Sequence, residues 1–290
     1  MDVGNECFGE NGFYPISFSY PESSYLHIKS KIVADIIPGS RETYKYDDYG
    51  SYLGEYKKSY YGITHKKAGW DCFRHVEILH SNCIPLMQDA AQIPKYTMTH
   101  HPKELYVDLY ERFQRTNEAP SEEELHKITS HFNNTLTTKN MIKYIFSKIG
   151  IMPKNVLFVD SSLPEKEDYL SMLTLIGLKQ IYGQKCVEAF ITPYLYDSYL
   201  PDTKRLYGLG FGYSRLLPAS SISGLKSLDD AKEFDLVIVG NLRRNEEVIK
   251  KLNSINVPKV YLFGEDHTVD QLDFRKIISN LPGYTFVREI

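Results

Sequence analysis

A chain of 290 residues with 42% hydrophobic and 24% charged residues is long and apolar enough for two folded domains. Its formal net charge of −3 excludes an overall positive potential that would attract nucleic acid or anionic lipid. A phosphate group could therefore bind only where cationic groups are gathered locally. The scattered cysteines exclude a zinc knuckle or disulfide framework, and the lack of a leader or of ~20 consecutive apolar residues predicts a cytoplasmic protein without a membrane span.

The first part of the chain predicts a strand at residues 32–37 and a second strand at 60–64, followed by a cationic loop at 65–69. A helix over 70–79 and a short strand over 83–87 come next. This order of strand, loop, helix and strand is typical of a Rossmann-like half. The tyrosines that cluster between Tyr44 and Tyr61 indicate either a packing surface or a surface that stacks on sugars.

The polar middle of the chain predicts two helices. Ser121-Glu122-Glu123-Glu124 is a capping box for a helix to about residue 132, and residues 138–148 form the second helix. We therefore expect a donor-binding domain at 1–115, a helical linker at 116–150 and an acceptor-side Rossmann-like domain at 151–290.

The last part of the chain alternates strands and helices more regularly. Strands are predicted at 155–160, 186–190, 235–240 and 257–263, with helices at 168–182 and 245–252. Such alternation predicts a parallel sheet with right-handed crossovers, and hence an α/β fold.

The segment from Ser59 to Leu79 is the most informative for function. Its loop carries two lysines and a glycine, and Asp71 or the residue before it is expected to cap the helix that follows. A helix N-terminus with nearby cations suits a phosphate group. Arg74 and Glu77 lie three residues apart on one predicted helix face, so Arg74 could contact a phosphate while Glu77 accepts hydrogen bonds from ribose hydroxyls. The candidate donor-binding residues are Thr64, Lys66, Lys67, Gly69, Trp70, Asp71, Arg74, Glu77 and, after the first strand, Arg41.

Each of these features also has a purely structural interpretation. An Arg–Glu pair on a helix is commonly a surface ion pair, and paired lysines are commonly part of a solvated loop. Trp70 is either a core anchor or a ring that stacks on a nucleobase. The phosphate hypothesis depends on all of them lying together on one strand–loop–helix.

Residues Ser59 to Pro85 resemble the donor-binding segment of exostosin-like glycosyltransferases, a group with the GT-B fold. The resemblance rests on Arg74, Glu77 and Cys83-Ile84-Pro85, while Ser81-Asn82 stands where that family usually has a glycine. Further similar runs cover most of the chain outside residues 115–135: Pro15-Ile16-Ser17-Phe18-Ser19, Ile37-Pro38-Gly39-Ser40-Arg41-Glu42-Thr43-Tyr44, Phe158-Val159-Asp160-Ser161-Ser162, Asp168-Tyr169-Leu170, Leu206-Tyr207-Gly208-Leu209-Gly210-Phe211, Gly264-Glu265-Asp266 and Val287-Arg288-Glu289.

In the proteins that the chain resembles, the half similar to residues 155–290 comes first. The chain therefore resembles a circularly permuted member, in which Ile290 is expected to lie near residues 10–16. The resemblance implies two Rossmann-like domains that face a central cleft, with the permuted domain order.

The same resemblance implies a glycosyltransferase that moves a sugar from a nucleoside diphosphate donor to a glycan acceptor. It implies inversion at the anomeric centre without a bound metal, and a UDP-sugar, with UDP-xylose as one option, as the donor. The pairs of adjacent acids in the chain do not have the pattern of a metal-binding motif. The partners implied are the nucleotide-sugar and the glycan acceptor; no nucleic acid and no resident cofactor are expected.

An inverting transfer needs a base that takes the proton of the acceptor hydroxyl. Asp168 and Asp160 are the main candidates because they follow predicted strands of the second half, and Asp266 and His267 are further options. Asp168 could instead be an ordinary helix N-cap, and Asp160 could brace its loop.

Two other functions fit the same sequence. A nucleotide-sugar epimerase of GT-B shape would convert the donor without an acceptor. A non-catalytic nucleotide- or glycan-binding module would bind UDP without turnover.

Overall fold

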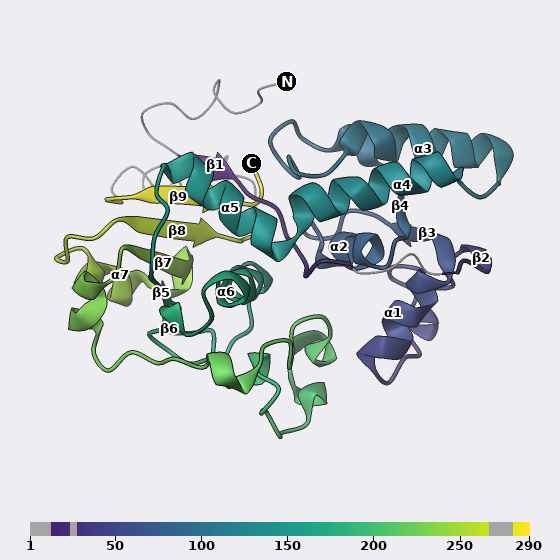
Figure 1. Ribbon diagram of the computed structural model, residues 1–290. Coiled ribbons are helices and arrows are strands. Elements are labelled where there is room, and N and C mark those ends of the chain that lie inside the picture. Colours follow the sequence, from purple (N-terminus) through teal and green to yellow (C-terminus); the bar gives the residue numbers. More distant parts are fainter. Residues whose placement is uncertain (1–12, 24–27, 267–280) are drawn as a thin grey trace. The chain divides into compact units, whose positions relative to one another are not determined.

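The computed structural model describes residues 13–23, 28–266 and 281–290, and it divides into two compact units. The six-stranded unit comprises Met1–Ile16 and Met141–Ile290, and the three-stranded unit comprises Ser17–Asn140. Both units combine a parallel sheet with helices, as Figure 1 shows, so the predicted α/β class is confirmed.

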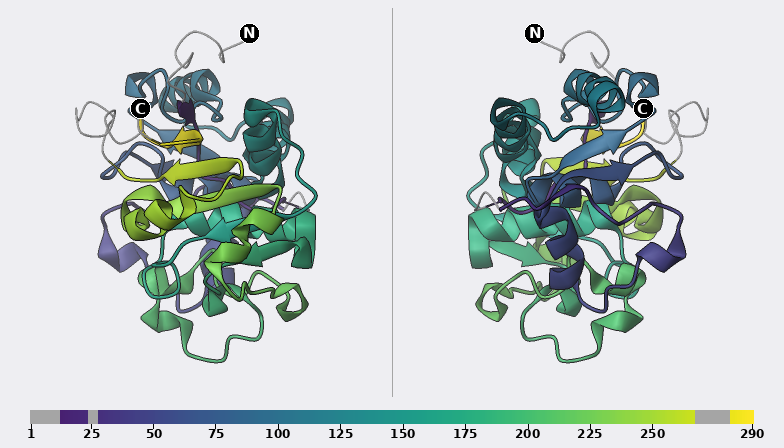
Figure 2. Two further views of the ribbon diagram at one scale, coloured as in Figure 1. Left: turned by 90° about the vertical axis from the view of Figure 1, so that its left-hand side faces the viewer. Right: turned by 90° about the vertical axis from the view of Figure 1, so that its right-hand side faces the viewer.

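The six-stranded unit is built on a parallel sheet with the strand order β1-β9-β8-β7-β5-β6. From β6 to β9 this is the 2-1-3-4-5 order of doubly wound folds, whose switch point lies here between β5 and β7. The turned views of Figure 2 show the same strands from two further sides. The bounds are β1 Phe13–Pro15, β5 Val156–Val159, β6 Cys186–Glu188, β7 Leu236–Asn241, β8 Lys259–Phe263 and β9 Tyr284–Val287.

Both faces of this sheet are buried. Alternate residues such as Leu157, Val159 and Val237 form one apolar cluster with Val248 and Leu252 of α7 (Glu246–Leu252). The residues between them along the strands are equally buried, and α6 (Tyr169–Tyr182) packs against β5, β6 and β7. Burial on both faces explains why the strands are continuous apolar runs. The other helices of the unit are α5 Thr138–Ile149 and the 3₁₀ helices Gly183–Lys185, Pro193–Leu195, Thr203–Arg205, Tyr207–Gly210, Ala219–Ser221, Leu228–Glu233 and Leu242–Arg244.

The three-stranded unit has the parallel order β2-β3-β4. Gly62 in the central strand explains how closely the helices approach it, because a Cβ there would lie 3.0 Å from the Tyr56 ring and 3.1 Å from Ile78. The elements are β2 Lys31–Val33, β3 Ser59–Thr64, β4 Ile84–Met87, α1 Tyr49–Lys57, α2 Phe73–His80, α3 Lys103–Thr116, α4 Glu122–His131, the π-helical turn Phe132–Leu136 and the 3₁₀ helices Arg41–Thr43 and Ala90–Gln92.

The first and last described strands lie side by side. β1 pairs with β9 in parallel, Pro15 opposite Val287, and the Ile16 amide donates to the Val287 carbonyl at 2.9 Å. This confirms the expected closeness of the end of the chain to residues 13–16, while residues 10–12 lie outside the described part.

The division into units differs from the expected domain boundaries. It falls at 16/17 and 140/141, whereas the sequence places boundaries at 115/116 and 150/151. Helix α4, with the predicted Ser121–Glu124 capping box, belongs to the three-stranded unit. Within the described ranges, no helix is both long and apolar enough to cross a membrane.

Candidate functional site

Helix α2 begins three residues later than the sequence predicts, at Phe73 instead of residue 70. Its N-cap is Cys72, which makes no side-chain capping hydrogen bond, so the expected cap at Asp71 is wrong. The Asp71 carboxylate instead accepts from the Phe18 amide at 2.8 Å and lies 3.6 Å from His101. This buried acid stabilises the fold of the unit and leaves the first turn of α2 without a side-chain cap.

Arg74 lies in the first turn of α2 and is buried, with 9% of its surface exposed. Its guanidinium lies 5.6 Å from the centre of the Tyr44 ring. Among the described residues, no group accepts a hydrogen bond from its Nε or Nη1 atoms. A buried guanidinium with unsatisfied donors is costly in the free protein and is suited to an anionic ligand.

Glu77 lies one turn further along the same helix and is 5% exposed. The Tyr52 hydroxyl donates to Glu77 Oε2 at 3.1 Å. Burial raises the pKa of the Glu77 carboxyl from 4.5 to about 7, and the charge of Arg74 limits this rise. Arg74 and Glu77 are therefore both buried, and both lie in a tyrosine-rich interior.

The loop before α2 is exposed from residue 65 to residue 68. Lys66 Nζ lies 4.9 Å above the ring of Trp70, and that ring is buried. Partial desolvation and the charge of Arg74 lower the pKa of Lys67, although its side chain as a whole is exposed. Lys67 and Arg74 therefore share one electrostatic environment, whereas Trp70 anchors the loop to the core.

Thr64 and Gly69 hold the loop in place. Thr64 Oγ1 lies 3.0 Å from His75 Nδ1, and the other ring nitrogen of His75 lies 2.9 Å from the Trp70 carbonyl. The Gly69 carbonyl accepts from the Lys67 amide at 3.1 Å. Burial lowers the pKa of His75 to about 3, so this imidazole is neutral and positions the loop.

Arg41 begins a short 3₁₀ helix, and its side chain is exposed. Its carbonyl accepts from the amide of Tyr44, the residue whose ring lies against Arg74. The segment that carries Arg41 thus reaches the Arg74 environment.

Asp160 follows β5 and is fully engaged inside the six-stranded unit. Its Oδ1 accepts from the Ser162 amide at 3.2 Å and from Asn245 Nδ2 at 2.9 Å, and its Oδ2 accepts from the Asn241 amide at 3.1 Å. Gly240 allows this approach, because a Cβ there would lie 2.2 Å from the carboxylate. Asp160 braces its loop, which was the structural alternative.

Asp168 is the N-cap of α6, and its side chain accepts from the Ser171 amide at 2.9 Å. Its second oxygen accepts from Asn241 Nδ2 at 3.0 Å. Unlike Asp160 it is half-buried, so it combines the capping role with access to solvent. Asp266 is bound to Arg288, and His267 lies outside the described residues.

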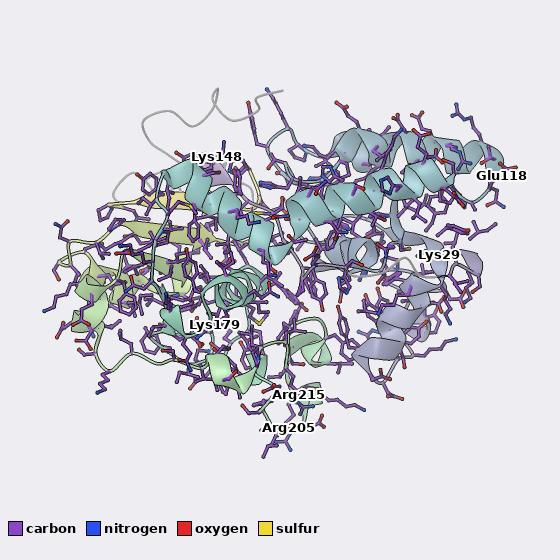
Figure 3. All side chains as sticks on the ribbon, viewed as in Figure 1. Lys29, Glu118, Lys148, Lys179, Arg205 and Arg215 are labelled. Carbon is purple, nitrogen blue, oxygen red and sulfur yellow. The ribbon has the colours of Figure 1, made fainter. Side chains whose placement is uncertain are left out.

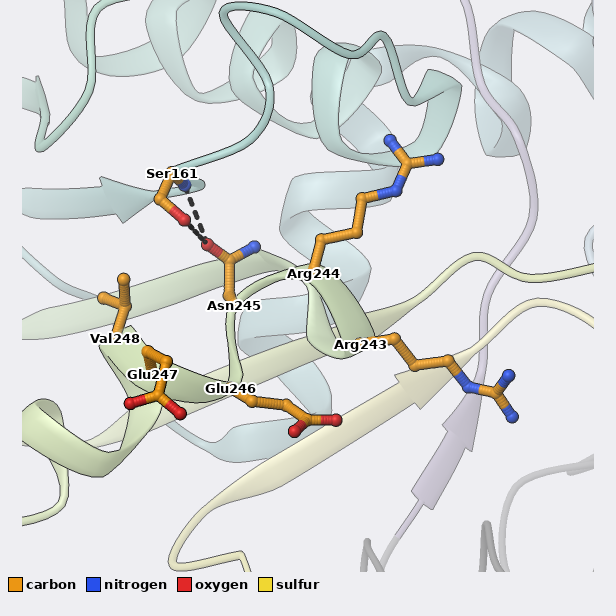
Figure 4. A pocket seen from close by; sticks show the side chains of 7 residues that line it. All are labelled: Ser161, Arg243, Arg244, Asn245, Glu246, Glu247 and Val248. Atoms are coloured by element: carbon orange, nitrogen blue, oxygen red, sulfur yellow. Dashed lines mark hydrogen bonds between the residues drawn. The ribbon is translucent and has the colours of Figure 1, made fainter.

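A pocket of about 290 Å³ opens at the switch point between β5 and β7, and its lining includes Ser161 and Asn245, which adjoin Asp160. Ser161 donates to Asn245 through its amide at 2.7 Å and its hydroxyl at 2.9 Å, as Figure 4 shows. Arg244 Nη1 donates to the carbonyls of Lys166 and Glu167. The lining residues are Ser161, Arg243, Arg244, Asn245, Glu246, Glu247 and Val248.

The sequence interpretation missed the arginines of this pocket. The available signal was their position directly after the predicted strand at 235–240, since ligands of doubly wound folds bind at the carboxyl ends of strands. Among the described residues, no group of three or more His, Cys, Asp or Glu side chains could hold a metal ion.

Comparison of the chain with protein-family models, with curated proteins and with solved structures gave no match in any of the three.

Proposed function

We propose that the protein is a glycosyltransferase that moves a sugar from a nucleoside diphosphate donor, a UDP-sugar, to a glycan acceptor. An acceptor hydroxyl oxygen attacks the anomeric carbon, and the bond from that carbon to the β-phosphate oxygen breaks. The nucleoside diphosphate leaves with the bonding electron pair, and a carboxylate takes the acceptor proton.

The observation that carries this proposal is the buried guanidinium of Arg74. Arginine presents five N–H donors, and among the described residues neither Nε nor Nη1 of Arg74 has an acceptor. A phosphate oxygen would supply the missing acceptor and a compensating charge. We therefore place the donor diphosphate against Arg74.

Two neighbours support an anion at this position. Lys67 shares the electrostatic environment of Arg74, and the first turn of α2 has N–H groups without a side-chain cap. The one acid in this environment, Glu77, has a pKa of about 7 and is therefore partly neutral at physiological pH. The local charge is positive in a chain that is acidic overall.

We propose Asp168 as the catalytic base. Its carboxylate is half-buried, whereas that of Asp160 is buried, although both oxygens of each acid accept hydrogen bonds. The pocket at the switch point of the same unit is the place for the acceptor.

A nucleotide-binding protein without transferase activity is the second candidate. It is favoured by the hydrogen bonds that both candidate bases make to their own loops and helices. Binding of UDP without turnover of any UDP-sugar would be its signature.

We also propose the GT-B arrangement with a permuted domain order. It is supported by the two parallel sheets and by the pairing of β1 with β9, which brings the end of the chain beside the segment that leads into Ser17. In an unpermuted relative, these two segments would be continuous.

A panel of UDP, ADP, GDP, UDP-glucose and UDP-xylose tests the proposal by thermal shift, with and without EDTA. We expect stabilisation by the uridine compounds, of about 2.7 kcal/mol at a hundred times the dissociation constant, and slow hydrolysis of the true donor. The absence of any shift with all five compounds would refute the donor site. Loss of the shift in EDTA would refute metal independence.

A further inference from the structure

Tyr207 has the most exposed aromatic side chain in the described part of the chain, with 68% of its surface accessible. Most tyrosines of the protein are buried or half-buried. An exposed ring of this size is therefore exceptional in this molecule, and its surroundings show how it is held.

Hydrogen bonds hold the main chain of Tyr207 through both its amide and its carbonyl, and a second ring contacts its side chain. Its amide donates to Glu167 Oε1 at 3.2 Å, and its carbonyl accepts from the Tyr213 hydroxyl at 2.7 Å. The ring of Tyr169 meets the Tyr207 ring edge-on, with centres 6.0 Å apart. The exposed ring thus has little conformational freedom to lose when it binds a ligand.

The turn after Tyr207 is strained. Gly208, Leu209 and Gly210 all have left-handed backbone angles, with φ of 59°, 63° and 72°. A leucine rarely adopts this conformation, and strain of this kind concentrates at ligand-binding sites. Tight packing holds the turn, because a Cβ on Gly210 would lie 3.0 Å from Thr203.

The segment of Tyr207 is held by the stretch of chain that carries the proposed base. Glu167 and Tyr169, which hold Tyr207, are the two chain neighbours of Asp168. The same segment carries the exposed cations Arg205 and Arg215, both labelled in Figure 3. The exposed ring of Tyr207 thus belongs to a residue whose amide donates to the Glu167 carboxylate, and a carboxylate can also accept hydrogen bonds from hydroxyl groups.

We infer that Tyr207 is a stacking platform for the acceptor saccharide, with Glu167 accepting hydrogen bonds from its hydroxyl groups. A sugar ring has an apolar C–H face that packs on an aromatic ring and a hydroxyl rim that needs acceptors, and this site offers both. The inference rests on the proposed transferase function and assigns the acceptor side of it.

The test measures saccharide binding directly. Lactose, cellobiose, maltose and xylobiose are titrated into the protein and followed by saturation-transfer difference NMR, while UDP binding is measured by calorimetry. The variants are Tyr207→Ala, which removes the ring, Tyr207→Phe, which keeps it, and Leu200→Ala, which truncates an apolar side chain that is 91% exposed in the same region.

We expect at least one of the four saccharides to bind the unaltered protein. Tyr207→Ala should weaken that binding at least about tenfold, while Tyr207→Phe and Leu200→Ala stay close to the unaltered protein. UDP affinity and melting temperature should be unchanged in all three variants, because the ring is exposed. The inference is overturned if none of the four saccharides binds, or if Tyr207→Ala binds as well as the unaltered protein.

The two measurements separate the two proposals. If UDP binds and saccharide binding does not depend on Tyr207, the stacking platform is refuted and the transferase proposal stands. If a saccharide binds at Tyr207 and UDP does not bind at all, the transferase proposal is refuted and Tyr207 belongs to a glycan-binding site.

Discussion

The Tyr52 hydroxyl donates a 3.1 Å hydrogen bond to the Glu77 carboxylate, and both side chains are buried in the three-stranded unit. A carboxylate without water is held in its charged form only by such donors and by nearby cations. Tyr52 and Arg74 act in this direction, but desolvation outweighs them, and the pKa of Glu77 rises to about 7. Glu77 is therefore a group that titrates near physiological pH beside the proposed phosphate site.

The first prediction concerns the pH dependence of stability. Because the pKa of Glu77 is raised from 4.5 to about 7 on folding, its contribution is fully present below pH 4.5 and is lost as the pH rises through about 7. At about 1.4 kcal/mol per pKa unit, the free energy of unfolding loses about 3 kcal/mol across this pH range. Glu77→Gln should therefore raise the free energy of unfolding at pH 8 and change it little at pH 4. Urea unfolding at both values checks this, with exposed Glu123→Gln as the control. A variant less stable at pH 8 would contradict it.

The second prediction concerns pH and ligand binding. A diphosphate beside Arg74 should raise the pKa of Glu77 further, because two anions in one buried site repel each other. UDP binding should then take up protons, and affinity should fall as the pH rises from 6 to 8. Calorimetry in buffers of different ionisation enthalpy measures the uptake. Glu77→Gln should remove the part of the pH dependence of UDP affinity that does not come from ionisation of the phosphate itself. Identical pH profiles for the unaltered protein and the variant would exclude Glu77 from the site.

The third prediction separates a binding arginine from a structural one. Arg74→Met removes a buried charge with unsatisfied donors, so the melting temperature without ligand should stay the same or rise, while UDP stabilisation is lost. The matched control is Arg112→Met. The Arg112 guanidinium donates to the Tyr61 hydroxyl at 3.3 Å and to the Ala119 carbonyl at 3.0 Å, so this variant should melt earlier and still bind UDP. A large fall in melting temperature for Arg74→Met would indicate a structural role.

The fourth prediction compares the two candidate bases. Asp168→Asn keeps a good N-cap for α6 but loses the hydrogen bond that the second oxygen accepts from Asn241 Nδ2. It should therefore cost about 1 kcal/mol of stability and keep the donor KM, while kcat falls at least about a hundredfold. Asp160→Asn places an amide where both oxygens accept hydrogen bonds, so it should cost about 1–3 kcal/mol of stability. Thermal unfolding and steady-state kinetics on both variants check this. Full activity of Asp168→Asn would assign the base elsewhere.

The fifth prediction concerns a buried charge unrelated to the proposed sites. Lys179, labelled in Figure 3, donates to the carbonyls of Cys186 and Ser221 and lies 3.3 Å from Glu188. Lys179→Met should cost about 3–5 kcal/mol, because it leaves the buried Glu188 carboxylate without its cation. The exposed pair Lys250–Glu247 provides the control, and Lys250→Met should cost under about 1 kcal/mol. The double variant Lys179→Met with Glu188→Gln should recover part of the stability that Lys179→Met loses.

The sequence patterns predict most strands and helices of this protein but miss β1, β9, α1 and α3. The apolar runs at 155–160 and 235–240 became β5 and β7, because buried parallel strands need apolar side chains on both faces. Helix α1 went unnoticed, since two glycines and three tyrosines in nine residues give no amphipathic pattern. The Ser121–Glu124 capping box succeeded because it acts through neighbouring residues alone.

The sequence by itself determined the α/β class, the strands other than β1 and β9, and the presence of Arg74 and Glu77 on one helix, because these depend on local patterns of apolar and polar side chains. Only the tertiary structure decided that both side chains are buried among tyrosines, that Asp160 braces its loop, and that Tyr207 is exposed while its amide donates to Glu167. Burial and hydrogen-bond partners come from residues far apart in the chain. The ionisation of Glu77 and the unsatisfied donors of Arg74 depend on those distant neighbours, which no spacing within a helix specifies.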